Sequence, residues 1–213
     1  GTKNTVSDLM EMKRKGMADQ IKSLTGTPIL GICGGYQMMG REIIDCGVED
    51  TEGRLCGLGL LNATTRFDRY EKRTAQVNKP VTGNGPILER LRGQEVTGYE
   101  IHTGQTDSLD PAAFGDDGAV AENGLVMGTY LHGIFDNQNF RDAFLDFLYE
   151  RKNPAGRGPA LGAGRAEERP LRAEGQRGSG YSELAEAVRS HLDMEKIWGM
   201  LNLEMPEGEE GAK

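Results

Sequence analysis

The sequence predicts an α/β fold, with a mixed sheet flanked by helices. A short apolar run bounded by glycine and proline, "GTPILGI", leads through a glycine-rich turn into a helical pattern, the strand–turn–helix unit of a parallel sheet. Short segments rich in β-branched residues and glycine then occupy 53–106, which indicates further strands. A hairpin pattern and an amphipathic helix follow, so strands and helices share one domain.

The first expected element is a helix beginning near Thr5, because Thr5 and Asp8 are spaced like a capping box. Apolar residues recur loosely at helical spacing from Met10 to Leu24, and Gly16 interrupts them. The strand "GTPILGI" follows this helical region.

The helical pattern after that strand runs from Gly35 to Ile44. "LCGLGLL", "TAQVNKPV" and "EVTGYEIHTG" are then expected as strands of a meander or mixed sheet. Asn123 and Gly124 predict a hairpin turn, since both tolerate positive φ, and the strand after it ends at His132. The helix "FRDAFLDFLYE" presents one apolar face, made of Phe140, Phe144 and Phe147 or Leu148.

Composition divides the chain into three parts. Residues 1–152 form the expected domain. Residues 153–180 carry many Gly, Pro and Arg and few large apolar side chains, which predicts a disordered insertion. Residues 181–213 read as a C-terminal helix that docks on the same domain, followed by an acidic tail.

The formal net charge of −8 argues against a protein that binds nucleic acids or acidic membranes without specificity. Cys33, Cys46 and Cys56 form no C-x-x-C pair, and we expect no metal site. Neither a secretory signal nor an apolar run of membrane-spanning length is found, so we expect a cytoplasmic protein.

The segment "GICGGYQMMG" predicts a nucleophile elbow with Cys33 at its corner. Such a turn is tight, so glycines lacking Cβ atoms are expected on both sides of the nucleophile. The N-terminus of the following helix favours a thiolate, so we expect a lowered pKa for Cys33. The backbone N–H after Cys33 points to where an oxyanion would develop.

A nucleophilic cysteine needs a base, and His132 is the best candidate. If its strand is parallel to the Cys33 strand and adjacent to it, both side chains emerge at the carboxyl edge of the sheet. His102 also lies near a strand end, whereas His191 lies in an ordinary polar setting on the C-terminal helix.

Four segments occur together in this order: "GICGGYQMMG", "GYEIHTG", "GTYLHGIFDN" followed by "FR", and "HLDMEKI". With them the chain resembles the C-terminal glutamine amidotransferase domains of the cobyric acid synthase family, over nearly everything except 153–180. The resemblance implies a class I glutamine amidotransferase-like, flavodoxin-like fold. The chain begins at "GTKNT" without a methionine, and we expect an N-terminally truncated domain that lacks the first strands.

The resemblance also implies roles. Cys33 attacks the side-chain amide of glutamine to form a thioester, and His132 acts as acid and then as base. The residues implied for oxyanion and substrate binding are Gly1, Thr2, Gly34, Gly35 and Gln37. The ammonia passes to a separate N-terminal synthetase domain, which uses ATP and Mg²⁺ to amidate a corrinoid. No cofactor is expected in the amidotransferase domain itself.

Tyr99, Glu100 and His102 match a family motif that flanks the site, without assigned roles. The wider amidotransferase class has a glutamate two residues after its histidine, but Ile134 stands there in this chain. Either a dyad operates, or a carboxylate such as Glu100 orients His132.

Four alternatives remain open. The acceptor enzyme could be a cobyrinic acid a,c-diamide synthase or a lipid II isoglutaminyl synthase. Cys33, Glu100 and His132 also satisfy the residue order of a thiol α/β-hydrolase. Finally, a truncated chain could be a non-catalytic interaction domain.

Overall fold

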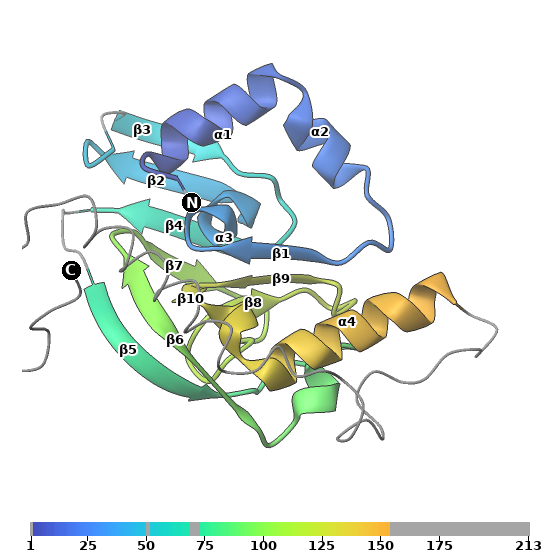
Figure 1. Cartoon of the computed structure of the whole chain (residues 1–213). Helices are drawn as coiled ribbons and strands as arrows, with labels where there is room; N and C mark the ends of the chain where they lie inside the picture. The colour runs from blue at the N-terminus through green and yellow to red at the C-terminus, as the bar shows by residue number, and fades with distance from the viewer. Residues whose placement is uncertain (1, 50–51, 69–72, 154–213) are drawn as a thin grey trace, which may run out of the picture. The chain divides into compact units, whose positions relative to one another are not determined.

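Three sheets carry the strands of the computed structural model, which describes residues 2–49, 52–68 and 73–153 (Figure 1). The strands are β1 (Ile29–Ile32), β2 (Glu42–Cys46), β3 (Glu52–Cys56), β4 (Ala63–Phe67), β5 (Arg73–Pro80), β6 (Glu95–His102), β7 (Gln105–Ser108), β8 (Ala119–Val120), β9 (Val126–Thr129) and β10 (Leu131–His132). The helices are α1 (Thr5–Arg14), α2 (Met17–Lys22), α3 (Gly34–Met39) and α4 (Gln138–Lys152), with 3₁₀ turns η1 (Leu88–Leu91) and η2 (Ile134–Asp136).

The strand orders are β1-β9-β8, β10-β6-β5 and β3-β2-β4-β7. The pairs β1–β9 and β2–β4 are parallel and the other pairs are antiparallel. The predicted α/β class with mixed pairing is therefore confirmed, with the strands divided among three sheets.

The first helical region is two helices, because Gly16 adopts a left-handed φ of 74° between α1 and α2. The expected cap is wrong by one residue. Asn4 is the N-cap of α1, and its side-chain oxygen accepts a hydrogen bond from the backbone N–H of Ser7 at 2.7 Å. Thr5 is left free to use its hydroxyl elsewhere.

The helix expected from Gly35 to Ile44 is also corrected, since α3 ends at Met39. Long-range backbone contacts stop it: the N–H of Arg41 donates to the carbonyl of Ala63, and that of Leu58 donates to the carbonyl of Met38. The chain then becomes β2, which pairs with β3 and β4.

The predicted hairpin is confirmed by the antiparallel pair β8–β9, with Gly124 at a φ of 65° in the turn. The predicted parallel neighbour of β1 is β9, with Ile29 opposite Val126 and Ile32 opposite Thr129. The helix α4 buries Phe140 and Phe147, as its pattern predicts.

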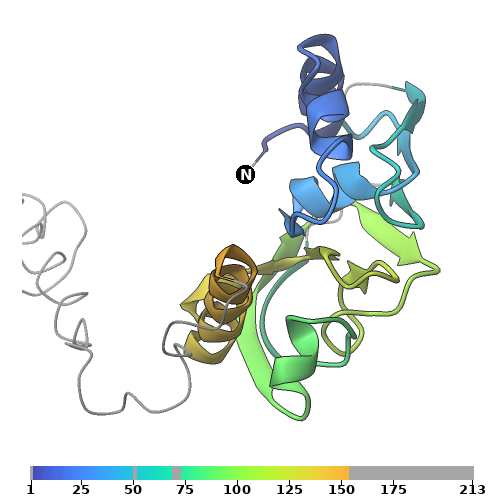
Figure 2. The ribbon, with the colours of Figure 1, turned by 90° about the vertical axis from the view of Figure 1, so that its right-hand side faces the viewer.

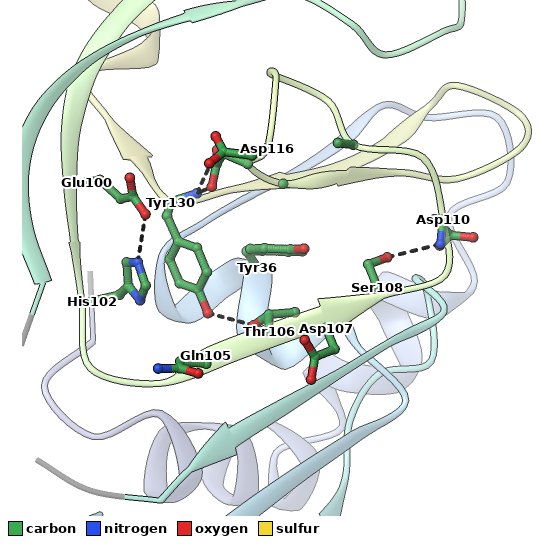
Figure 3. Close-up of a pocket in the computed structure, with 13 residues that line it drawn as sticks. Tyr36, Glu100, His102, Gln105, Thr106, Asp107, Ser108, Asp110, Asp116 and Tyr130 are labelled. Atoms are coloured by element: carbon green, nitrogen blue, oxygen red, sulfur yellow. Dashed lines mark hydrogen bonds and ion pairs between the residues drawn. The ribbon is translucent and has the colours of Figure 1, made fainter. Parts of the chain in front are cut away.

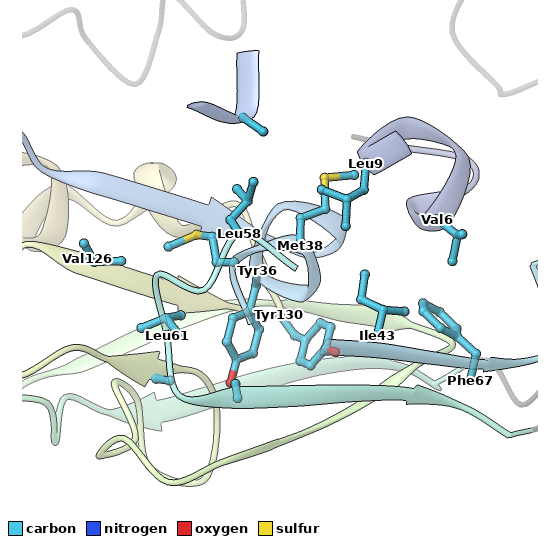
Figure 4. Packing of buried hydrophobic residues seen from close by; sticks show 14 residues of the cluster. Val6, Leu9, Tyr36, Met38, Ile43, Leu58, Leu61, Phe67, Val126 and Tyr130 are labelled. Atoms are coloured by element: carbon cyan, nitrogen blue, oxygen red, sulfur yellow. The ribbon is translucent and has the colours of Figure 1, made fainter. Parts of the chain in front are cut away.

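Two buried apolar clusters hold these elements together. One lies around α1, α3 and β2 and includes Leu9, Met38 and Phe67 (Figure 4). The other joins α4 to η1, η2 and the strands β8 and β9. Figure 2 shows the ribbon of these elements, with α4 in yellow to orange. Tyr36 reaches from α3 onto β9, where a Cβ on Gly128 would lie only 2.0 Å from the Tyr36 ring. This close approach packs α3 against β9, next to Cys33, which directly follows β1.

The described residues belong to one structural unit, Gly1–Gly164. Apart from Asn153, the insertion predicted for 153–180 and the C-terminal helix predicted for 181–213 lie outside the described residues. No helix in the described ranges has the length and apolar character needed to cross a membrane.

Candidate active site

Cys33 occupies a strained turn between β1 and α3. It has φ 55° and ψ −116°, and among the residues that the structure describes it is the one non-glycine with a positive φ. Gly31 is required there, because a Cβ at that position would lie 2.3 Å from the Met39 sulfur and 2.8 Å from the Gly35 carbonyl carbon. On the other side of Cys33, a Cβ on Gly34 would lie 2.0 Å from the Thr2 methyl carbon, whereas Gly35 has open space around it. The expected crowding therefore holds for Gly31 and Gly34 but not for Gly35.

The structure brings Cys33 and His132 together at one carbonyl group. The Cys33 thiol donates to the carbonyl oxygen of Ile101 at 3.4 Å, and His132 Nε2 lies 3.3 Å from the same oxygen. Because a carbonyl only accepts hydrogen bonds, Nε2 is the protonated nitrogen of the His132 ring in this arrangement. Ile101 contributes only its backbone carbonyl, so its side chain carries no sequence signal for this role.

Strand pairing explains this convergence. The N–H of Cys33 donates to the carbonyl of Thr129 at 2.9 Å, which continues the β1–β9 ladder by one residue. The chain then leaves that sheet at Tyr130 and enters another, where His132 pairs with Tyr99 of β6. His132 is therefore at a strand end, as predicted, but in a different sheet from the strand beside Cys33.

The thiol is held in its protonated form. Desolvation by burial raises the pKa of Cys33 and outweighs the lowering effect of the Gly34 backbone N–H. The expected lowering of this pKa is thus wrong, because burial of the thiol has the larger effect. The Cys33 side chain is half-buried, which accounts for the desolvation. The helix α3 that follows it has only six residues.

Glu100 is buried and serves a different histidine from the one expected. Its carboxylate lies 3.0 Å from His102 Nε2, 3.2 Å from Arg73 Nε and 3.6 Å from Lys79 Nζ. The β6–β10 register accounts for this, because Glu100 is opposite Leu131 and successive side chains of a strand point to opposite faces. Glu100 therefore orients His102, and the proposal that it orients His132 is not supported by the geometry.

His102 packs against Tyr130 and the backbone of Gly104. Its ring stacks on Tyr130 at a centroid distance of 3.8 Å, and its Nδ1 donates to the carbonyl of Gly104 at 2.7 Å. Since Glu100 and His102 flank Ile101 in β6, their contacts fix the strand that supplies the shared carbonyl. Tyr99, the third residue of this motif, is 52% exposed.

A family model for the CobB/CobQ-like glutamine amidotransferase domain matches residues 1–140. The chain belongs to this family. It is 51% identical over 206 residues to a probable cobyric acid synthase of Methanococcoides burtonii, an alignment that covers 96% of the chain and 39% of that protein. It is 50% identical over 200 residues to a probable cobyric acid synthase of Methanosarcina mazei, covering 93% of the chain and 38% of that protein. The chain spans about two fifths of the length of these curated relatives.

Gln37 lies inside the amidotransferase domain and is only 3% exposed. Its side-chain oxygen accepts from the Thr5 hydroxyl at 2.9 Å, and its nitrogen donates to the Tyr130 hydroxyl at 3.2 Å. Both ends of the amide are therefore engaged by α1 and by the chain leading to His132. This placement makes Gln37 a support of the elbow, and its implied contact with substrate glutamine stays a prediction.

The residues implied for the oxyanion site are partly assembled. Gly34 follows Cys33 at the start of α3, and Thr2 lies against it, since a Cβ on Gly34 would come within 2.0 Å of the Thr2 methyl carbon. The Thr2 hydroxyl donates to the Asp8 carboxylate. Gly1 lies outside the described residues.

A polar cavity of about 410 Å³ is lined by Tyr36, Tyr130 and side chains from β6, β7 and the loop that follows β7 (Figure 3). Neither Cys33 nor His132 lines this cavity. Five carboxylates do: Glu100, Asp107, Asp110, Asp116 and Asp117. Such walls repel anions, so this cavity is not suited to the carboxylate of glutamine. Within the described ranges, no three His, Cys, Asp or Glu side chains converge as ligands for a metal ion.

Proposed function

We propose that this domain hydrolyses glutamine and supplies the ammonia to an ATP-dependent synthetase that amidates corrin carboxylates in cobalamin biosynthesis. The main support for the proposal is that the Cys33 thiol and the His132 imidazole both contact the carbonyl oxygen of Ile101. Family membership and the two probable cobyric acid synthases support the same reaction.

In the proposed mechanism, entry of glutamine displaces the two contacts with Ile101. The neutral His132 ring then moves its proton from Nε2 to Nδ1, and Nε2 accepts the thiol proton. The sulfur attacks the side-chain carbonyl carbon, and the Gly34 N–H stabilises the oxyanion that forms. His132 then protonates the amide nitrogen, the C–N bond breaks and ammonia leaves a γ-glutamyl thioester on Cys33. Water attacks the thioester, gives one proton to His132, and glutamate departs as that proton returns to the sulfur.

The geometry favours a dyad over a triad in this mechanism. Glu100 is committed to His102, Arg73 and Lys79, and Ile134 replaces the glutamate of the wider class. The backbone pairing of His132 with Tyr99 helps to orient the imidazole, a role that a glutamate has in the wider amidotransferase class.

The partners form the second part of the proposal. We assign the corrinoid acceptor, ATP and Mg²⁺ to a synthetase domain, as implied by relatives that are more than twice as long as the aligned region. A cobyrinic acid a,c-diamide synthase is the rival acceptor enzyme, since the family description covers both CobB-like and CobQ-like domains. A cytoplasmic location is proposed from the three unpaired thiols.

Glutamate release from glutamine tests the activity. We expect release by the wild-type chain and a fall of at least 10³-fold for Cys33→Ala, because no other group replaces the nucleophile. Cys46→Ala is the matched control and should keep the wild-type rate, since Cys46 lies on β2 away from the elbow. Equal rates for Cys33→Ala and Cys46→Ala would refute the proposal.

A further inference from the structure

The geometry of the proposed site depends on the joint at residues 129–131, where the chain passes from one sheet to another. On one side of the joint, the Thr129 carbonyl accepts from the Cys33 N–H at 2.9 Å. On the other side, His132 pairs with β6. Any change in the backbone at Tyr130 therefore alters where the imidazole lies relative to the sulfur.

One buried carboxylate satisfies the polar groups of this joint. Asp117 is 4% exposed, and its two oxygens lie 3.1 and 3.3 Å from the Tyr130 N–H. The Thr129 hydroxyl also donates to Asp117, and the oxygen of that hydroxyl accepts from the Leu131 N–H at 3.0 Å. Two successive backbone donors at a point where the chain changes sheets are thus bound by Asp117, directly or through one hydroxyl.

The backbone around Asp117 is itself fixed. Its N–H donates to the Phe114 carbonyl at 2.8 Å, and its carbonyl accepts from the Phe114 N–H at 2.9 Å. The next residue, Gly118, has φ 77°, and a Cβ there would lie 2.2 Å from the Gly128 carbonyl oxygen. The loop that carries Asp117 therefore lies tightly against β9, so the carboxylate is a rigid attachment for the joint.

We propose that Asp117 is a positioning residue for the reaction, which holds His132 beside Cys33 by fixing the backbone from Thr129 to Leu131. The inference rests on the proposed glutaminase chemistry, because it assigns His132 as the group to be positioned. Burial raises the pKa of the Asp117 carboxyl, with the Thr129 and Tyr130 hydrogen bonds acting in the opposite direction. In each of these contacts an oxygen of the Asp117 carboxyl group is the acceptor.

The test compares Asp117→Asn, Asp117→Ala and Asp116→Asn in the 213-residue chain with Cys46 and Cys56 changed to serine. Asp117→Asn keeps an acceptor oxygen for the Tyr130 N–H and should retain kcat within threefold. Asp117→Ala removes it and should lower kcat at least tenfold, with KM changed less than twofold. Asp116→Asn, a neighbouring carboxylate that is 83% exposed and pairs with Lys79, is the control and should match wild type.

A second readout separates this inference from the proposed function. The rate of Cys33 alkylation by iodoacetamide is measured against pH, with His132→Ala as reference. Asp117→Ala should shift the profile in the same direction as His132→Ala, whether or not the chain releases glutamate. An inactive wild type that shows this shared shift would overturn the glutaminase proposal alone.

Wild-type kcat or an unshifted alkylation profile in folded Asp117→Ala would overturn the positioning role. Equal losses of kcat in Asp117→Asn and Asp117→Ala would overturn it as well. Thermal unfolding shows whether each variant is folded at the assay temperature. If Asp117→Ala fails to fold, Thr129→Val replaces it, since valine keeps the shape of threonine and removes the hydroxyl that links Asp117 to Leu131. We expect a threefold or greater fall in kcat for Thr129→Val, and no fall would overturn the inference.

Discussion

At the scale of single residues, Cys33 combines backbone strain with a protonated thiol. Its positive φ is maintained by the close packing of Gly31 against α3, and its proton is directed at the Ile101 carbonyl. The reactive thiolate therefore forms only when another group takes the proton. His132 is the group beside it that can do so.

The raised pKa of Cys33 predicts the pH dependence of its alkylation. Desolvation favours the neutral thiol in the folded chain, so less thiolate is present at a given pH than in the unfolded chain. We expect the midpoint of the pH–rate profile for iodoacetamide to lie at higher pH in the folded chain than in urea. Peptide mapping by mass spectrometry assigns the reaction to Cys33. A folded-state midpoint at or below the unfolded one would mean that the helix N-terminus stabilises the thiolate more than burial destabilises it.

At the scale of elements, Gln37 links α3 to two other segments that approach the site. The Thr5 hydroxyl lies at the first turn of α1, and the Tyr130 hydroxyl belongs to the joint before β10. Tyr130 also shares a hydrogen bond of 2.6 Å with Thr106 of β7. The elbow helix is thus tied by polar contacts within an otherwise apolar core.

Replacing Gln37 with leucine should lower the free energy of unfolding by about 1–3 kcal/mol, because the buried hydroxyls of Thr5 and Tyr130 each lose a partner. Gln20→Leu on the exposed surface of α2 is the matched control, and we expect a change within about 0.5 kcal/mol. Urea unfolding followed by circular dichroism measures both. A Gln37→Leu variant as stable as Gln20→Leu would show that these hydrogen bonds add nothing to packing.

The elements that the sequence predicted best are those with local signals. "GTPILGI", the Asn123–Gly124 turn and the apolar face of α4 each carry their pattern within a few residues. The end of α3 at Met39 was missed because it depends on contacts with Ala63 and Leu58, which are distant in sequence. The N-cap was missed because Asn4 and Thr5 are both suitable capping residues, and only the backbone distinguishes them.

In the candidate site, too, the residues with local sequence signals were predicted and those that depend on distant contacts were not. The elbow glycines and the strand-end histidine identified Cys33 and His132 from sequence, and the structure brings both to one carbonyl. The partner of Glu100 could not be predicted, since it follows from the β6–β10 register. Asp117 had no signal of its own in the sequence, because its importance arises only where β9 gives way to β10.

At the scale of the whole molecule, the reactive pair is built at the meeting of two sheets. Cys33 directly follows β1 in the sheet of β1 and β9, and His132 belongs to the sheet of β10 and β6. A pair divided in this way responds to any movement of one sheet against the other.

The most direct test of the central claim is the detection of a γ-glutamyl thioester on Cys33. The wild-type chain and His132→Ala are incubated with glutamine and quenched in acid, and the peptide containing Cys33 is examined by mass spectrometry. The account predicts a γ-glutamyl adduct on Cys33 in the wild type, removed by hydroxylamine, and little adduct in His132→Ala because the thiol keeps its proton. Glutamate release without any adduct on Cys33, or equal adduct in both chains, would contradict it.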